Sequence, residues 1–174
     1  AMDKAVVLAR GLGTRMRRAD PAARLTARQA RAAEAGLKAL IDVGRPFLDY
    51  GLTALADAGY RRACLVVGPE HDELRDYYGR QVRPARLEIS FAVQQTPRGT
   101  ADAVLAAEQF AGGEPFLVVN CDNYYPVNAL AALRRLRTPG LVGFGREGML
   151  AGGNIPPERV PRFAIIRDDG AGWL

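Results

Sequence analysis

The sequence predicts an α/β fold, namely a Rossmann-like, mostly parallel sheet with helices on both faces. Short apolar runs alternate along the chain with segments whose apolar residues recur at helical spacing. This alternation is typical of parallel strands joined by crossover helices. The first apolar run, Lys4–Leu8, leads directly into a glycine turn, Gly11-Leu12-Gly13. Because such sheets bind ligands at the carboxyl ends of their strands, this turn marks one edge of the sheet as a candidate site.

The strands are predicted from short apolar runs. Most of these runs are continuous, as expected of strands that are buried on both faces, and one alternates between apolar and polar residues. The loops that follow Leu8, Val93 and Val119 carry unusual residues and are expected to converge on one cleft. In chain order the predicted strands are Lys4–Leu8, Ala63–Val67, Leu87–Val93, Phe116–Val119, Leu141–Phe144 and Phe163–Ile166.

The helices are predicted from helical spacing between recognisable start and stop signals. Gly59 ends the first helix, Pro69 and Gly79 bracket the second, and Thr100 begins the third as an N-cap or first-turn residue. The sole histidine, His71, is expected on the surface of the second helix. The predicted helices are Pro46–Ala58, Glu70–Tyr78, Thr100–Phe110 and Val127–Leu136.

Composition and cysteine usage indicate an ordinary globular protein of the cytoplasm. The chain has 174 residues, of which 48% are hydrophobic and 25% charged, enough for one sizeable core. No apolar run approaches the roughly 18 residues that cross a bilayer, so no membrane partner is expected. No signal peptide precedes Lys4–Leu8, and two cysteines, Cys64 and Cys121, do not suggest a disulfide framework.

The net charge of +5 concentrates in the segment Arg10–Arg31. Charge alone leaves nucleic acid, a polyphosphate ligand and simple solvation of a surface helix about equally open. The segment lacks aromatic residues on which bases would stack, and it adjoins the glycine turn. An arginine-rich segment beside a glycine turn suits a polyphosphate ligand as well as a nucleic-acid backbone, so the charge does not decide between these partners.

The glycine turn lies within the motif Leu8-Ala9-Arg10-Gly11-Leu12-Gly13-Thr14-Arg15-Met16. A Gly-x-Gly turn after a strand lets backbone N–H groups approach a phosphate, Thr14 adds a hydroxyl donor, and Arg15 adds a planar cation. Taken alone, the same pattern also fits a simple tight turn. It lacks the third glycine of a dinucleotide fingerprint and the Lys-Ser/Thr of a Walker A loop.

Three further segments gain weight only in combination. Lys38 precedes an apolar run and can reach a phosphate as a point charge. The segment 94–101, Gln-Gln-Thr-Pro-Arg-Gly-Thr-Ala, offers the donor and acceptor of Gln94 for a base edge, although a capped helix after a proline turn explains it equally. Asp122 follows a buried strand, where a carboxylate can hold Mg²⁺, although a lone aspartate there is more often a helix cap or a turn residue.

Together the four segments resemble the sugar nucleotidyltransferases, the nucleoside-diphosphate-sugar pyrophosphorylases. Leu8 to Met16 resembles the family's L-A-A-G-x-G-T-R-M/L, and Leu37-Lys38-Ala39-Leu40 resembles its P-K-x-L. Gln94 to Ala101 resembles its base-contacting element, and Cys121-Asp122-Asn123 resembles its metal-binding G-D-N. The order and the spacing agree across nearly the whole chain.

The resemblance implies transfer of a nucleotidyl group from a nucleoside triphosphate to a sugar 1-phosphate, with Mg²⁺ as cofactor. Arg15 and Lys38 would be the catalytic cations, and Asp122 would ligate the metal. Gln94 and Gly99 would contact the base. The residues that the resemblance assigns to nucleotide binding are Leu8, Ala9, Gly11, Gly13, Thr14, Gln94, Gly99 and Thr100.

The sequence departs from the family pattern at several positions. Arg10 stands where the family has a small residue, Cys121 replaces a glycine, and Leu37 replaces a proline. The segment between Arg15 and Lys38 is also longer than usual. The chain ends at Leu174, before the family's E-K-P element and its second metal-binding aspartate. We therefore expect residues 1–174 to form a single nucleotidyltransferase domain without its C-terminal acceptor-binding portion.

Two alternatives stay open at this point. One is a non-catalytic nucleotide-sensing domain of the same fold, which the presence of Arg15, Lys38 and Asp122 disfavours. The other is a nucleotidyltransferase with a different acceptor, such as phosphocholine or a molybdopterin. The sequence names neither the base nor the sugar, and it leaves assembly into a homo-oligomer open.

Overall fold

The computed structural model describes residues 2–11, 26, 38–82, 84–152 and 156–166. The described residues fall into two compact units, one within Ala1–Arg137 and the other within Thr138–Leu174. The first unit contains the whole sheet. Within the described part of the chain, no helix is both long and apolar enough to cross a membrane.

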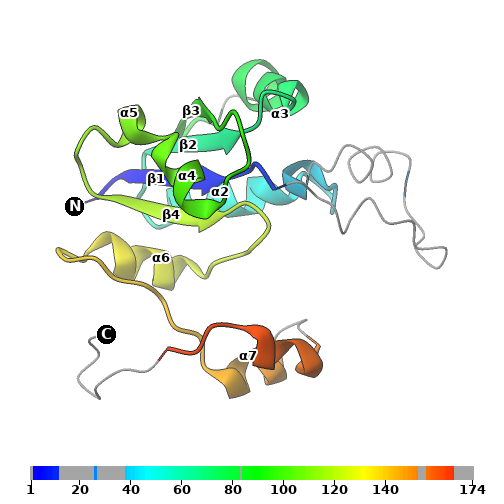
Figure 1. The fold of residues 1–174 in the computed structure, drawn as a ribbon, viewed down its shortest axis with the longest axis vertical. Helices are drawn as coiled ribbons and strands as arrows, with labels where there is room; N and C mark the ends of the chain where they lie inside the picture. Colours follow the sequence, from blue (N-terminus) through cyan, green and yellow to red (C-terminus); the bar gives the residue numbers. More distant parts are fainter. Residues whose placement is uncertain (1, 12–25, 27–37, 83, 153–155, 167–174) are drawn as a thin grey trace. The chain divides into compact units, whose positions relative to one another are not determined.

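Four parallel strands form the sheet in the order β3-β2-β1-β4 (Figure 1). They are β1 (Lys4–Leu8), β2 (Arg62–Val67), β3 (Glu88–Val93) and β4 (Phe116–Asn120). The register sets Leu8 beside both Val66 and Asn120. All carboxyl ends therefore lie at one edge of the sheet. This arrangement confirms four of the predicted strands and the parallel topology.

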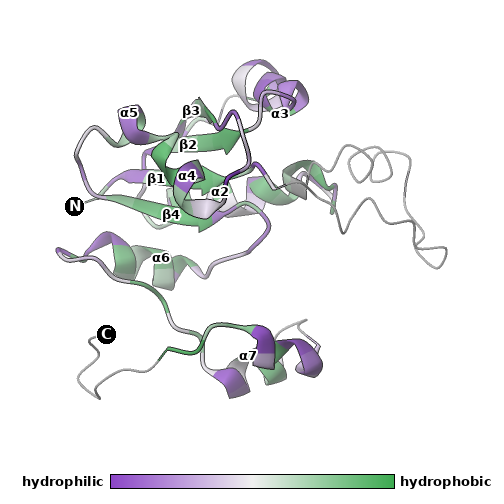
Figure 2. Cartoon of the chain, viewed as in Figure 1, coloured by the Kyte–Doolittle hydropathy of each residue, from purple (hydrophilic) through white to green (hydrophobic). Residues whose placement is uncertain are grey.

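The central strands form because both of their faces are buried. β1 and β2 are apolar almost throughout, and Figure 2 shows hydrophobic residues along the sheet. Both faces of these strands are buried. One face carries Val6, Cys64 and Val66, and the other carries Val7 and Leu65, each at most 1% exposed. A strand covered on both faces tolerates few polar residues, which explains the continuous apolar runs.

Helices cover both faces, as predicted (Figure 1). On one face α2 (Phe47–Asp57) and α6 (Val127–Arg134) bury Leu52, Leu55 and Leu130 in the core cluster that contains Val7 and Leu65. The leucines of α2, Leu48, Leu52 and Leu55, recur four and three residues apart, so they share one side of the helix.

On the other face, α4 (Thr100–Leu105) and α5 (Glu108–Ala111) lie against the sheet. Ala103 and Ala107 join Val6, Cys64 and Val66 in a second buried cluster. The sequence predicts one helix over 100–110, and here the structure differs. The Ala107 N–H donates to Val104 O three residues back, at 3.0 Å, and this tighter turn separates α4 from α5.

The predicted helix over 70–78 is shorter than expected. α3 (Asp72–Asp76) runs directly into a π-helix, η2 (Tyr77–Gln81). The Tyr78 hydroxyl donates to Asp49 Oδ1 on α2 at 2.7 Å, and burial raises the pKa of this hydroxyl. This part-buried bond holds the segment to α2.

His71 does not lie on a helix surface, so that prediction is wrong. The ring is only 5% exposed, and His71 precedes the first residue of α3. Its Nδ1 accepts the Gly68 N–H at 3.2 Å and closes the turn that follows β2. The imidazole is buried because it accepts a hydrogen bond from the Gly68 N–H, a buried backbone donor that needs a partner.

The second unit contains α7 (Arg146–Gly152) and a 3₁₀ helix, η3 (Pro157–Arg162). The strands predicted at 141–144 and 163–166 are wrong, since neither segment is a strand. Leu141 is 55% exposed and Ile165 is 84% exposed. An apolar run becomes a strand only where a neighbour pairs with its backbone, and no described strand does so here.

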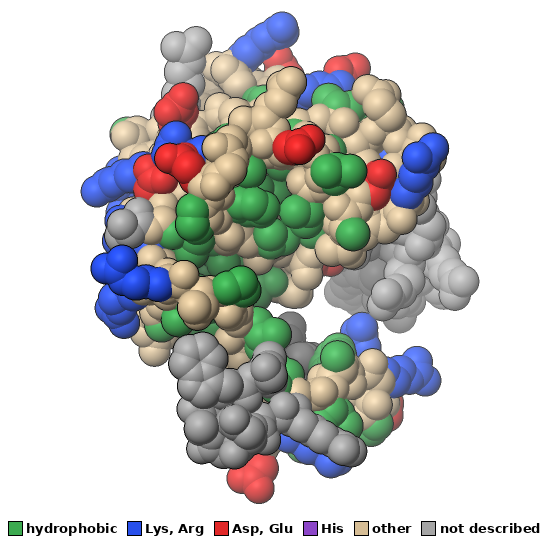
Figure 3. All heavy atoms as spheres, turned by 60° about the vertical axis from the view of Figure 1, so that its left-hand side comes forward, with side chains coloured by type: hydrophobic (Ala, Val, Ile, Leu, Met, Phe, Trp, Pro, Cys, Tyr) green, Lys and Arg blue, Asp and Glu red, His purple; other side chains and the backbone are tan. Residues whose placement is uncertain are grey.

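The amino ends of the strands carry a compact cluster of charges. Lys4 is 5% exposed, and its Nζ donates to Ala111 O at 2.8 Å and forms an ion pair with Glu114. Arg62 bonds to Asp3 at 2.9 Å and lies 3.6 Å from Glu114, and the Arg62 hydrogen bond lowers the pKa of Asp3. Figure 3, turned toward this side, shows acidic and basic side chains next to one another.

Candidate functional site

A cleft of about 270 Å³ lies at the opposite edge of the sheet, where β1, β3 and β4 end. It joins the three loops that the sequence predicts should converge. Both apolar and polar groups line it, which suits a ligand with a flat ring and a charged portion. Its lining residues are Leu8, Ala9, Arg10, Gly11, Gln94, Pro97, Gly99, Thr100, Ala103, Asn120, Cys121 and Asp122.

Backbone hydrogen bonds continue past the strand ends and hold the three loops together. The Ala9 N–H donates to Val66 O at 2.9 Å, and the Cys121 N–H donates to Leu8 O at 3.2 Å. The Gln94 N–H donates to Val67 O at 2.9 Å. The first residue of each loop is therefore fixed by the sheet itself, so the walls of the cleft are positioned before any ligand binds.

Two glycines leave open space at the cleft. Among the described residues, no atom lies within 4 Å of a Cβ added at Gly11 or Gly99, so a ligand can approach both backbones. Gly99 has φ +112°, a conformation that side chains strongly disfavour. It therefore turns the chain between β3 and α4 where another residue would be strained.

Gln94 is the best-buried polar side chain of the cleft, with 4% of its surface exposed. Its Nε2 donates to Gly99 O at 3.2 Å and to Asp102 Oδ2 at 2.7 Å. The side chain is thus held by both the turn and the first helical turn of α4, and it is ordered before a ligand arrives.

Arg10 joins the loops that follow β1, β2 and β3. Its Nη2 lies 3.4 Å from Glu70 Oε2 and 3.3 Å from Gln95 O, and the side chain is only 7% exposed. Among the described residues, nothing accepts a hydrogen bond from its buried Nε or Nη1. The pKa of Glu70 is lowered, first by a hydrogen bond from its own backbone N–H and then by the charge of Arg10.

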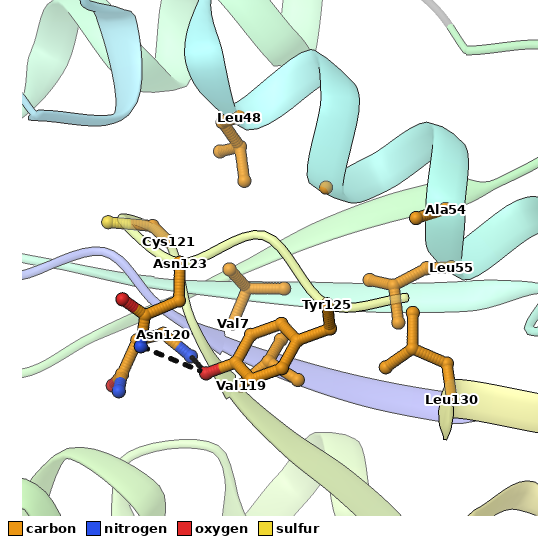
Figure 4. A pocket seen from close by; sticks show the side chains of 11 residues that line it. Val7, Leu48, Ala54, Leu55, Val119, Asn120, Cys121, Asn123, Tyr125 and Leu130 are labelled. Atoms are coloured by element: carbon orange, nitrogen blue, oxygen red, sulfur yellow. Dashed lines mark hydrogen bonds between the residues drawn. The ribbon is translucent and has the colours of Figure 1, made fainter. Parts of the chain in front are cut away.

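The loop after β4 carries Asp122 on its surface. Tyr125 braces this loop, because its hydroxyl oxygen accepts from the Asn120 N–H at 3.4 Å and from Asn123 Nδ2 at 3.3 Å (Figure 4). A hollow of about 10 Å³ lies beneath, between the loop and α2, with room for about one water molecule. The hollow is part of the core packing rather than a second site.

The described residues contain no group of three or more His, Cys, Asp or Glu side chains that would hold a metal by themselves. Asp122 supplies one exposed carboxylate to the cleft. A magnesium ion that arrives with phosphates needs only one or two carboxylates, since phosphate oxygens and waters complete its shell. The donor set therefore fits a nucleotide-borne Mg²⁺ and does not fit a structural metal site.

The cleft brings together most of the residues that the sequence singled out. Gly13, Thr14 and Arg15 lie outside the described residues, and Lys38 begins the 3₁₀ helix η1 (Lys38–Leu40) with its side chain outside them too. The predicted residues that line the cleft are Leu8, Ala9, Gly11, Gln94, Gly99, Thr100 and Asp122.

Sequence reasoning missed two contacts. The Arg10–Glu70 pair joins residues 60 positions apart, and nothing local connects them. The sequence indicates the Gln94–Asp102 bond only weakly. An acidic residue in the first turn of a helix commonly faces back toward the preceding loop.

Comparisons with known proteins agree with this geometry. The family model described as nucleotidyl transferase matches residues 4–142. A glucose-1-phosphate thymidylyltransferase from Streptomyces griseus is 35% identical over 122 residues, which cover 70% of this chain and 30% of that enzyme. A UTP–glucose-1-phosphate uridylyltransferase from Bacillus subtilis is 29% identical over 97% of this chain and 58% of its own length.

Solved structures share the fold. The UTP-bound UDP-glucose pyrophosphorylase (UGPase) of Acinetobacter baumannii superposes with a TM-score of 0.60 at 21% identity, over 76% of this chain and 51% of that one. The chain thus spans between about a third and three fifths of these relatives. With its parallel sheet, its cleft at the strand ends and its matching motifs, the chain belongs to the nucleotidyl transferase family.

Proposed function

We propose that this chain carries the nucleotide site of an enzyme that transfers a nucleoside monophosphate from a nucleoside triphosphate to a sugar 1-phosphate. The products are an NDP-sugar and pyrophosphate. One observation carries the proposal: a single cleft collects residues from the ends of β1, β3 and β4 in a chain of this family. The relatives' names supply the acceptor, since both are glucose-1-phosphate nucleotidylyltransferases.

In the proposed reaction, a phosphate oxygen of the acceptor attacks the α-phosphorus. The bond from that phosphorus to the bridging oxygen breaks, and pyrophosphate leaves with the electron pair. Such displacement needs positioning and charge neutralisation more than a nucleophilic side chain. Arg15 would neutralise charge on the leaving pyrophosphate, and Lys38 would hold phosphate oxygens.

The other proposed contacts are supported by the lining of the cleft and by the family resemblance. The backbones of Leu8, Ala9 and Gly11, with Gly13 and Thr14, would face the phosphates, because a glycine turn leaves their N–H groups accessible. Gln94, Gly99 and Thr100 would contact the nucleoside. Asp122 would hold Mg²⁺, which neutralises phosphate charge when bound.

Further parts of the proposal concern the surroundings of the enzyme. We propose that the enzyme acts in the cytoplasm, with no nucleic-acid or membrane partner. The single nucleotidyltransferase domain of residues 1–174 would bind the nucleotide, and the acceptor would also contact a C-terminal portion. Assembly of identical chains is compatible with the proposal and is not required by it.

The test uses the full-length protein with each nucleoside triphosphate, Mg²⁺ and a panel of sugar 1-phosphates. Pyrophosphate release that depends on the acceptor is the expected result. Including phosphocholine and a molybdopterin in the panel separates a sugar acceptor from other acceptors. Nucleotide binding without release by any pair would contradict the catalytic proposal and favour a nucleotide sensor.

A further inference from the structure

The side-chain amide of Gln94 has one stable orientation, and Asp102 sets it. Nε2 of Gln94 lies 2.7 Å from Asp102 Oδ2 and 3.2 Å from Gly99 O. An ionised carboxylate and a carbonyl can only accept hydrogen bonds, so the atom that faces both must be the amide nitrogen. The flipped amide would place its oxygen against two other oxygens.

This orientation uses both hydrogens of the Gln94 amide. A primary amide has two N–H donors, and Asp102 and Gly99 take one each. The remaining polar atom is Oε1, and no described residue donates a hydrogen bond to it. Gln94 lines the cleft, and its backbone N–H is fixed to Val67 O at 2.9 Å, so the residue cannot turn away as a whole. Gln94 therefore offers the ligand an acceptor and no donor.

We propose that Asp102 is a positioning residue that makes the site select nucleobases with a ring N–H, namely uracil, thymine or guanine. Cytosine and adenine carry a lone pair at the corresponding ring nitrogen, and this lone pair would face Oε1 of Gln94. Their amino groups would reach the oxygen only if the ring shifted within the cleft. The inference rests on the proposed function, because it takes the ligand to be a nucleotide with its base at Gln94.

The selectivity has a simple physical origin. A matched base donates to an acceptor that is already oriented, whereas a mismatched base leaves two acceptors opposed at a side chain that is only 4% exposed. Free rotation of the amide would remove this difference, because glutamine would then present its nitrogen to cytosine or adenine. Asp102 supplies the selectivity by preventing that rotation.

An acidic residue in the first turn of a helix also stabilises the helix, so the test must separate this effect from orientation. Glu108 provides a matched control, since it lies in the first turn of α5, is exposed and has no described side-chain contact. Replacing either acid by leucine removes a helix-start charge, but only Asp102→Leu frees Gln94. Asp102→Asn keeps an oxygen acceptor and serves as the conservative variant.

The experiment measures the dissociation constants of UTP, CTP, GTP and ATP for the full-length protein by calorimetry, without acceptor. The two ratios, CTP to UTP and ATP to GTP, compare bases of equal ring size. If the cleft binds pyrimidines, the CTP to UTP ratio applies, and if it binds purines, the ATP to GTP ratio applies. In the wild-type protein we expect that ratio to be at least about tenfold, typical of one hydrogen bond gained or lost. Glu108→Leu should retain it, and Asp102→Asn should retain more of it than Asp102→Leu, in which it should fall below about threefold.

A ratio near one in the wild-type protein, or a ratio that survives Asp102→Leu, would overturn the proposal. Loss of all pyrophosphate release would contradict the proposed function instead, and the binding ratios would still decide this inference. Should Asp102→Leu not fold, the side-chain amide signals of Gln94 give a second test by nuclear magnetic resonance. Two slowly exchanging Nε2 protons are expected in the wild-type protein, and rapid exchange of either would contradict the assigned orientation.

Discussion

The two ends of the sheet treat their polar groups in opposite ways. At the amino ends, the charges of Lys4, Arg62, Asp3 and Glu114 are matched with one another, and Lys4 also bonds to a backbone carbonyl. At the carboxyl ends, Arg10 has two buried donors without a described acceptor. Buried polar groups are nearly always satisfied in native proteins, so unsatisfied ones at a cleft indicate a place for a ligand.

The two ends of the sheet have different roles: the amino ends contribute to stability, and the carboxyl ends form the cleft. The charges of Lys4, Arg62, Asp3 and Glu114 at the amino ends pair with one another and hold the chain together. The cleft at the carboxyl ends has its backbone fixed by the sheet, while its side chains present open hydrogen-bonding capacity. Mutations at the two ends should therefore change different measured quantities.

The largest effect is expected for Asp122→Asn at the cleft. Loss of the carboxylate that would hold Mg²⁺ should lower turnover by at least about 100-fold. Even mutation of a residue that only hydrogen-bonds to a metal ligand lowers activity by about 10- to 100-fold. Because the side chain is exposed, the variant should still fold, and thermal unfolding checks this. Pyrophosphate release measures the effect, and Glu73→Gln, an exposed acid on α3, is the control. Undiminished turnover would remove Asp122 from its proposed role.

Lys4→Met at the amino end should act on stability alone. The substitution leaves Ala111 O and Glu114 without the ammonium group that they share. The free energy of unfolding should fall by about 1–3 kcal/mol, the cost of an unpaired buried polar group. Urea denaturation measures this loss, and the nucleotide dissociation constant should stay at the wild-type value. A variant as stable as the wild-type protein, or one with weakened nucleotide binding, would erase the contrast between the two ends.

Arg10→Met should show the reverse pattern. It removes the donor to Gln95 O and the two open donors, but it keeps an apolar stem of similar length. Nucleotide affinity should fall about tenfold, close to the contribution of one charged hydrogen bond, with less than about 1 kcal/mol lost in stability. Calorimetry checks the affinity. Arg86→Met, which breaks the exposed pair with Asp57, is the control. Equal affinities for Arg10→Met and the control would contradict the role of Arg10.

The smallest effect is the pH dependence of stability. Hydrogen bonds from Arg62 and Lys4 lower the pKa values of Asp3 and Glu114, respectively. A carboxyl whose pKa is lower in the folded state stabilises the fold above its ordinary pKa, 3.8 or 4.5 here, and this contribution is lost as the pH falls. Thermal unfolding midpoints between pH 6 and pH 3 should decrease, and less steeply in Lys4→Met. Identical slopes would show that the Lys4–Glu114 pair does not contribute.

Much of the fold could be predicted because its signals are local. Three of the four strands are dense apolar runs and β3 alternates between apolar and polar residues, so local patterns alone define them. The runs at 141–144 and 163–166 resemble strands equally well but have no described strand to pair with. A sequence pattern reports the burial that a segment prefers, whereas a strand also requires a partner.

For the site too, some features could be predicted from the sequence and others could not. Gln94, Gly99 and Asp122 follow predicted strands, and the parallel topology brings them to one cleft without further information. The Arg10–Glu70 pair depends on how loops from different strands meet, and the orientation of Gln94 depends on how the turn after β3 leads into α4. The position of a side chain could be predicted from the sequence, but its hydrogen-bond partners could not.

The most direct test of the central claim is to map nucleotide binding on the backbone of the protein. Titration of the ¹⁵N-labelled protein with UTP and Mg²⁺ should shift the amide signals of Ala9, Gly11, Gly99 and Cys121, which line the cleft. The signals of Lys4 and Arg62 at the other end of the same strands should stay in place. Shifts centred on the amino ends, or no shifts with any nucleoside triphosphate, would contradict the assignment of the cleft as the nucleotide site.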